Sequence, residues 1–227
     1  MKIICSKSSL LKSVSIALKA VPSKTTMPIL ECILMDATTN QIKFTTNDME
    51  LGIETIVEGT IEEKGKVALD AKIFYEIIRR LPDNDITIKT DDKYAATITC
   101  EKAKFNIPGK SGEDFAYLPM IEKDEPLTIS QYTLKEMIRQ TIFSIAVNEN
   151  NKLMTGELFE IKNNCLKVVS LDGHRIAIRR MELKKDYSDR KVVVPGKTLN
   201  EVSKILSGEL DDLVNIYFSK NHILFEF

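Results

Sequence analysis

The sequence contains an internal duplication, and this feature constrains the fold more than any other. Residues 40–44, Asn-Gln-Ile-Lys-Phe, resemble residues 164–168, Asn-Cys-Leu-Lys-Val. Residues 66–72 likewise resemble residues 191–197 at nearly the same offset. A repeat period above about 100 residues indicates duplicated domains rather than a solenoid of short units. With 227 residues, the chain is long enough for two such domains.

The two halves are predicted to share one order of elements. Each begins with a short strand and a helix whose apolar residues recur at spacings of three and four, which marks one buried face. Alternating strands joined by turn dipeptides follow, and then a second helix and further strands. The predicted elements are strands 3–6 and 127–129, first helices 8–21 and 131–146, and second helices 73–81 and 198–206.

These patterns predict an α+β chain of two tandem similar domains, each with two helices packed on antiparallel sheets. We place the domains at 1–118 and 119–227, because residues 109–126 hold the glycines and prolines typical of a linker. The first half has a further predicted strand, 104–108, without a counterpart in the second half. We therefore expect the second domain to be incomplete near its last strand.

Composition excludes several classes of protein. The chain is 43% hydrophobic and 29% charged, a balance typical of globular proteins rather than of disordered or fibrous ones. No apolar run reaches the length of about 18 residues that a membrane helix needs, and the N-terminus has no signal-peptide pattern. We therefore expect no membrane partner and a cytoplasmic location.

Motifs for catalysis and for metal binding are missing from the sequence. It has no phosphate-binding loop, no zinc-protease motif and no nucleotide-binding glycine pattern. The two histidines have no partners at metal-ligand spacing. We predict neither a cofactor nor a metal site. The widely spaced cysteines are expected to be buried, reduced thiols: Cys5, Cys32, Cys100 and Cys165.

One pair of residues leaves an enzymatic alternative open. Asp172 and His174 could act as an orienting acid and a base, which would make the chain a small-molecule enzyme of α+β fold with its site at this turn. Residues two apart across a tight hairpin rarely point at one another, and the simpler interpretation is that Asp172-Gly173 only forms the turn. A buried pocket with a strongly shifted histidine would favour the enzyme.

Charge is unevenly distributed along the chain. The whole chain has a net charge of −1, whereas each of the four predicted helices is net positive. Such a cationic set, extended by Lys24 in a loop, attracts phosphate without reading bases. Basic residues interleaved with aromatic ones, as used for stacking single strands, are absent, so the expected ligand is the phosphate backbone of a nucleic-acid duplex. A protein-interaction scaffold is the alternative if these cations scatter over several faces.

A turn in the second half differs from its counterpart in the first. Residues 171–176, Leu-Asp-Gly-His-Arg-Ile, occupy the place of residues 47–52, Asn-Asp-Met-Glu-Leu-Gly. The turn position is shared, but the side chains have diverged, as a site confined to one domain would require. The turn offers polar hydrogen-bond donors, and three apolar residues are expected beside it: Met154, Leu171 and Ile176. This combination predicts a binding site, or seat, for a short peptide.

Four segments carry a resemblance to a known family. They are the opening Met-Lys with Leu10-Leu11-Lys12, residues 27–30 (Met-Pro-Ile-Leu), residues 47–50 (Asn-Asp-Met-Glu) and residues 171–175 (Leu-Asp-Gly-His-Arg). Across essentially the whole chain, the sequence resembles the bacterial sliding clamp, the beta subunit of DNA polymerase III. Members of this family have three similar domains per chain, so the resemblance implies the first two here, with the third absent.

The resemblance implies a processivity factor without catalysis of its own. Two chains of the family close head to tail into a homodimeric ring, helices inward, that slides on duplex DNA and tethers the replicative DNA polymerase. The polymerase and clamp-loader subunits would bind through short peptides. The family's DNA-facing positions correspond to Lys24, Lys72, Arg79, Asn148 and Lys197. Its peptide pocket corresponds to Met154, Leu171, Gly173, His174, Arg175 and Ile176.

Overall fold

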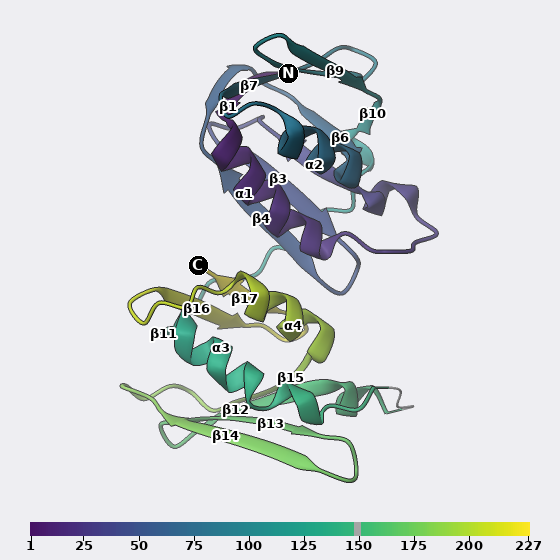
Figure 1. Cartoon of the computed structure of the whole chain (residues 1–227). Coiled ribbons are helices and arrows are strands. Elements are labelled where there is room, and N and C mark those ends of the chain that lie inside the picture. The colour runs from purple at the N-terminus through teal and green to yellow at the C-terminus, as the bar shows by residue number, and fades with distance from the viewer. Residues whose placement is uncertain (148–150) are drawn as a thin grey trace. The chain divides into compact units, whose positions relative to one another are not determined.

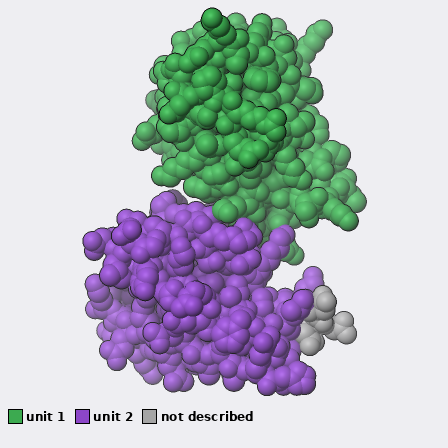
Figure 2. Space-filling view, viewed as in Figure 1, with its two compact units in different colours: residues 1–118 green, residues 119–227 purple. Residues whose placement is uncertain are grey.

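The computed structural model describes residues 1–147 and 151–227 of the chain. These residues form two compact units, Met1–Leu118 and Pro119–Phe227, which we call unit one and unit two (Figure 2). Each unit has its own hydrophobic core, and among the described residues the two cores have no member in common.

Unit one consists of two antiparallel sheets and two α-helices (Figure 1). Its elements are β1 Lys2–Ser6, α1 Lys7–Ala17, β2 Cys32–Asp36, β3 Ile42–Asn47, β4 Gly52–Val57, β5 Thr60–Glu63, β6 Lys66–Asp70, α2 Ala71–Arg80, β7 Asp85–Thr90, β8 Ala96–Cys100, β9 Ala103–Ile107 and β10 Gly109–Ser111. One sheet has the strand order β5-β1-β7-β8-β9 and the other the order β10-β6-β2-β3-β4. Helices α1 and α2 contact each other and bury Leu10, Val14 and Phe74 in the core.

Unit two repeats this arrangement with fewer strands (Figure 1). Its elements are β11 Leu127–Ser130, α3 Gln131–Arg139, β12 Gly156–Lys162, β13 Cys165–Leu171, β14 Ile176–Glu182, β15 Arg190–Pro195, α4 Gly196–Ile205, β16 Leu213–Phe218 and β17 Ile223–Glu226. The strand orders are β11-β16-β17 and β14-β13-β12-β15. Helices α3 and α4 contact each other and bury Leu134, Ile138 and Leu199.

The strand registers confirm the duplication and the α+β fold class. Leu34 of β2 pairs with Thr45 of β3 and with Ala68 of β6. Leu158 of β12 pairs in the same way with Val169 of β13 and Val193 of β15. Strands β6, β2, β3 and β4 therefore correspond to β15, β12, β13 and β14. Unit one also contains β9, at the place where the sequence predicts a strand over 104–108.

Local sequence explains where the helices begin and end. Ser6 and Asp70 are N-caps, and their side chains accept hydrogen bonds from the backbone N–H groups of Ser9 and Ile73. The predicted helix over 131–146 is too long, because α3 ends at Arg139 and a short 3₁₀ turn follows.

The expected linker over 109–126 is wrong in its first part. Residues Gly109–Ser111 form β10 on the edge of β6, and Phe115 is only 3% exposed, packed on Cys32, Leu34 and Ala68. A buried aromatic ring removes far more apolar surface from water than a flexible linker would. Residues 112–118 therefore belong to unit one, and we call them the strap.

Candidate nucleic-acid and peptide interfaces

Four of the five predicted DNA-facing residues present their side chains to solvent. Lys72 and Arg79 are exposed on α2, Lys197 is exposed on α4, and Lys24 is exposed in a loop of unit one. Lys72 and Arg79 are two helical turns apart and so lie on one face of α2. Asn148 lies outside the described residues. Since Lys197 belongs to unit two, a cationic surface shared by both units stays a prediction.

Acidic residues on the same helices partly compensate these cations. Glu76 accepts hydrogen bonds from Arg79 at 2.8 Å and from Arg80 at 3.2 Å, which hold its pKa below the ordinary value. Exposed pairs of this kind contribute little to stability, so a phosphate can compete for the guanidinium groups. Among the described residues, Lys24 and Lys72 have no carboxylate within ion-pair distance. Helix α3 contains the pair Glu136–Arg139, at 2.7 Å, and α4 the pair Glu201–Lys204, at 2.6 Å.

One lysine counted among the helix cations makes a structural contact instead. Lys135 Nζ donates to the carbonyl oxygen of Leu206, the C-cap of α4, at 3.0 Å. Lys7 donates to the carbonyl of Leu81, the C-cap of α2, in unit one. A cation at a helix C-terminus compensates the unpaired carbonyls there. Lys135 is therefore less available to a phosphate than its charge in the sequence suggests.

Asp172 holds the hairpin turn between β13 and β14. Its Oδ1 accepts hydrogen bonds from the backbone N–H groups of His174 and Arg175, both at 3.1 Å. Its Oδ2 accepts from Arg175 Nε at 2.8 Å. Gly173 has a φ of 86°, in the left-handed region that glycine occupies without strain. The turn therefore presents His174 and Arg175 on a fixed backbone.

The corresponding turn of unit one has the same backbone arrangement. Asp48 Oδ1 accepts from the N–H groups of Glu50, at 3.0 Å, and Leu51, at 2.7 Å. Met49 takes the left-handed position, with a φ of 74°. The shared turn position predicted from the sequence is therefore confirmed, with different side chains on it.

This geometry argues against the enzymatic alternative. Both carboxylate oxygens of Asp172 already accept hydrogen bonds from donors within the turn. These hydrogen bonds, the one from the His174 N–H first, hold the pKa of Asp172 below its ordinary value, which makes it a weaker base. The His174 side chain is exposed rather than enclosed.

Five of the six predicted peptide-binding residues lie together on one hairpin. Leu171 and Ile176 are cross-strand partners beside the turn, and Ile176 is 60% exposed. Met154 lies on a separate 3₁₀ turn, Lys152–Thr155, which leads into β12, the neighbour of β13. Met154 is held there by its carbonyl, which accepts from Ala146 N–H at 2.9 Å.

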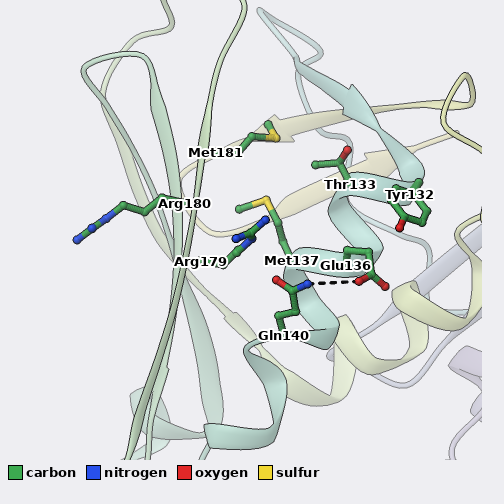
Figure 3. A pocket seen from close by; sticks show the side chains of 8 residues that line it. All are labelled: Tyr132, Thr133, Glu136, Met137, Gln140, Arg179, Arg180 and Met181. Carbon is green, nitrogen blue, oxygen red and sulfur yellow. Dashed lines mark hydrogen bonds between the residues drawn. The ribbon is translucent and has the colours of Figure 1, made fainter.

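Sequence reasoning missed a pocket between α3 and β14, of about 230 Å³ (Figure 3). Arg179 points into it while the next residue, Arg180, points away, as alternation along a strand requires. Hydrogen bonding by Arg139, and more weakly the charge of Arg179, hold the pKa of Glu136 low. The volume is below that of typical ligand sites, which start at about 300 Å³. The lining residues are Tyr132, Thr133, Glu136, Met137, Gln140, Arg179, Arg180 and Met181.

Other kinds of site are not supported in the described part of the chain. No group of three or more His, Cys, Asp or Glu side chains there is arranged to hold a metal ion. No described helix is both long and apolar enough to cross a bilayer. Cys5, Cys32 and Cys100 are buried as predicted, and burial raises the pKa of Cys5 to about 12, but Cys165 is only half-buried.

Two sequence profiles match the chain. The profile of the DNA polymerase III beta subunit, N-terminal domain, matches residues 1–119, and that of the central domain of the same subunit matches residues 128–227. The chain belongs to the DNA polymerase III beta subunit family. The resemblance based on residues 27–30 and 171–175 is thereby confirmed.

Solved DNA polymerase III beta subunits have the same fold. A crystal structure of such a subunit from Eubacterium rectale covers 100% of this chain with a TM-score of 0.99 and 66% identity. The Bacillus subtilis sliding clamp covers 100% with a TM-score of 0.96 and 34% identity. A Bartonella birtlesii sliding clamp, solved bound to griselimycin, is 28% identical with a TM-score of 0.90.

The chain is shorter than these members of the family. It spans 62% of the length of the Eubacterium rectale and Bacillus subtilis chains in the crystal structures. Over the beta sliding clamp of Halalkalibacterium halodurans it is 36% identical and spans 57% of that protein. The activity and partners of these longer proteins are therefore proposals for this chain.

Proposed function

We propose that residues 1–118 and 119–227 are the first two domains of a sliding clamp that encircles duplex DNA and tethers the replicative DNA polymerase. The clamp is a homodimeric ring and an accessory subunit without catalysis of its own. The observation that carries the proposal is the match to beta subunits over the whole chain, with a TM-score of 0.99 at 66% identity. Such a clamp works in the cytoplasm on replicating DNA.

The proposed DNA contacts are backbone contacts from the helices. The positive charge comes from exposed side chains: Lys72 and Arg79 on α2 and Lys197 on α4. Lys24, in a loop, adds a further cation. Asn148 is also a proposed DNA contact, on the basis of its position in the sequence alone. Contacts of lysine and arginine with phosphates carry no sequence information, which is what a sliding protein requires.

The proposed seat for partner peptides is the hairpin of β13 and β14 with Met154. Its support is an apolar cross-strand pair, half-buried Leu171 and exposed Ile176, beside the turn that Asp172 fixes. A rigid apolar seat with adjacent donors suits short peptides of the polymerase and of clamp-loader subunits. A sliding clamp of the same family, from Bartonella birtlesii, was solved bound to griselimycin.

The proposal is tested by measuring DNA binding as a function of salt. Fluorescence anisotropy of a labelled 30-base-pair duplex, titrated with the chain from 25 to 200 mM salt, is expected to give weak affinity that falls steeply, with a log–log slope of about −0.9 for each phosphate neutralised. Two duplexes of unrelated sequence should bind equally. Lys72→Glu should weaken binding and reduce the slope by about 1 to 2.

The matched control is Lys102→Glu, which makes the same charge change at an exposed turn between β8 and β9. We expect this variant to bind DNA with nearly unchanged affinity. Salt-insensitive binding, a preference for one of the duplexes, or equal losses in both variants would contradict the proposed interface.

A further inference from the structure

Three buried apolar positions of unit one are polar in unit two. The correspondence follows from the N-caps Ser6 and Ser130, from the 3₁₀ turns that end at Ala20 and Ser144, and from the strand registers. All six residues at these positions are no more than 1% exposed. The corresponding pairs are Ala17 with Thr141, Ala20 with Ser144, and Ile33 with Glu157.

A hydrogen bond that occurs in both units supports this alignment. Thr46 Oγ1 donates to the carbonyl oxygen of Ala17 at 2.6 Å, and Ser170 Oγ donates to that of Thr141 at 2.5 Å. The hydroxyl of Thr141 and the carboxyl of Glu157 have no polar counterparts in unit one, where the same space is filled by apolar side chains. The fold itself therefore does not require these two groups.

These groups connect the two parts of the peptide seat. The Thr141 carbonyl is held by Ser170, the residue before Leu171. The Thr141 hydroxyl lies 2.9 Å from Oε1 of Glu157, which follows Met154 by three residues. Since neighbouring residues of a strand point to opposite faces, Ser170 faces the core while Leu171 faces away from it. Thr141 therefore joins the strand of Leu171 to the segment of Met154 from the core side.

Two polar atoms of this cluster have no partner. Among the described residues, Glu157 Oε2 and Ser144 Oγ are buried without a hydrogen bond. The chain itself encloses both atoms, so a further protein segment packed on the surface would not reach them. A buried carboxylate with one oxygen lacking a donor is costly, whereas a protonated carboxyl can satisfy its hydrogen with a single acceptor.

The Thr141 hydroxyl has one hydrogen, and two acceptors compete for it. Its Oγ1 lies 2.7 Å from the carbonyl oxygen of Met137 as well as close to Glu157. A protonated Glu157 donates to Thr141, which leaves Thr141 free to donate to Met137. An ionised Glu157 needs the same hydrogen, so either the carboxylate or the Met137 carbonyl loses its donor. Ionisation therefore loosens the link between β12 and the end of α3.

No charged side chain in the described part of the chain stabilises an ionised Glu157. Burial raises the pKa of Glu157 to about 7, and the hydrogen bond with Thr141 is the other contribution to that pKa. Charged side chains on the elements around it are all exposed or half-buried. The nearest elements carry Arg139 on α3, Lys152 before β12, Lys167 on β13, Arg179 on β14, Lys191 on β15 and Glu201 on α4.

We infer that Glu157 is a positioning residue of the peptide seat, which holds the 3₁₀ turn of Met154 in place beside the hairpin of β13 and β14 while its carboxyl carries a proton. The inference rests on the proposed function of this hairpin as the seat. A partner peptide then meets an ordered seat when Glu157 is protonated and a loosened one when it is ionised.

Methyl NMR measures the environment of Met154 without any peptide. The chain is labelled with ¹³C at its methionine methyl groups, and the Met154 signal is assigned with Met154→Leu. As the pH is raised from about 5.5 to about 8.5, we expect this signal to shift with its midpoint at the pKa of Glu157, about 7. Met35, fully buried in unit one, is the internal control and should not shift.

Variants of the chain separate positioning from a merely structural role. Glu157→Gln should abolish the pH-dependent shift and keep Met154 at its low-pH signal, because the glutamine amide donates to Thr141 as the protonated carboxyl does. Thr141→Val should displace the signal at every pH, because it removes the connecting hydroxyl. Glu182→Gln makes the same chemical change at an exposed carboxyl of β14 and is the matched control, in which the shift should remain.

His174 needs a test of its own. Histidine also changes charge near neutral pH, and His174 lies on the turn of the seat. The Met154 shift should persist in His174→Gln. Three results would overturn the inference: a Met154 signal that does not move with pH, a shift that remains in Glu157→Gln, or a shift that disappears in His174→Gln. Because no peptide is present, failure of this titration counts against the role of Glu157, whereas failure of partner peptides to bind counts against the proposed seat.

Discussion

At the scale of single residues, Glu157 is the clearest departure from a simple core. It is fully buried at the position where unit one has Ile33, and burial raises its pKa to about 7. Its Oε1 lies 2.9 Å from the hydroxyl of Thr141, which also lies 2.7 Å from the carbonyl oxygen of Met137. A protonated Glu157 can donate to Thr141 while Thr141 donates to Met137, so the neutral carboxyl suits this site.

The free energy of unfolding should therefore depend on this carboxyl. Its pKa is about 7 in the folded chain against an ordinary 4.5, so the folded state keeps the proton longer and stability falls as pH rises between these values, by about 3 kcal/mol. Glu157→Gln should be more stable than the parent by about 1 to 3 kcal/mol at pH 8, and the difference should shrink towards pH 5. Urea unfolding followed by circular dichroism at both pH values measures this.

The control for this prediction is Glu182→Gln, which removes an exposed carboxyl from β14. We expect its stability to follow that of the parent at both pH values. Equal pH dependence of the parent and Glu157→Gln would contradict a proton bound at Glu157.

At the scale of elements, the strap is expected to stabilise unit one through its aromatic anchor. Phe115→Ala should destabilise unit one by about 3 kcal/mol, because the ring is buried on three strand residues and leaves a cavity. Tyr117→Phe should cost less than about 1.5 kcal/mol, since Tyr117 is 53% exposed and loses only the contacts of its hydroxyl with Lys66 and with the carbonyl oxygen of Gly112. Hydrogen exchange of β2 and β6 measures both changes, and similar effects of the two variants would show that Phe115 is not the anchor.

The elements were predictable where periodicity and repetition coincide. The helix over 73–81 and the strand over 104–108 match α2 and β9, and the helix over 8–21 matches α1 and the 3₁₀ turn that follows it, because each carries one apolar face. The strap was not predictable in this way, since a lone aromatic in a stretch of polar residues has no period. The available signal was β2, whose residues Cys32–Met35 are apolar on both faces and so require a cover on each side.

The candidate sites were predictable only in part, for reasons that differ between them. The turn at Asp172 was predictable from the sequence, because it depends on two neighbouring residues. The Asp172 side chain accepts hydrogen bonds from the turn backbone, and Gly173 adopts the left-handed conformation. Counting charges along the predicted helices identified Lys72, which is exposed, but also Lys135, which donates to the carbonyl oxygen of Leu206 instead. That contact depends on the packing of two helices, so the charge of a single helix does not predict it.

At the scale of the whole molecule, two separate cores predict two separate responses to mutation. Phe74 is fully buried in unit one, and Phe159 is 1% exposed in unit two. Phe74→Ala should destabilise unit one by about 3 to 5 kcal/mol and speed exchange of its slowest amides, while amides of residues 119–227 keep their rates. Phe159→Ala should do the reverse, and each variant serves as the control for the other in one hydrogen-exchange experiment. If either variant sped exchange in both units, the units would unfold together, and the duplication would describe the architecture of the chain but not its stability.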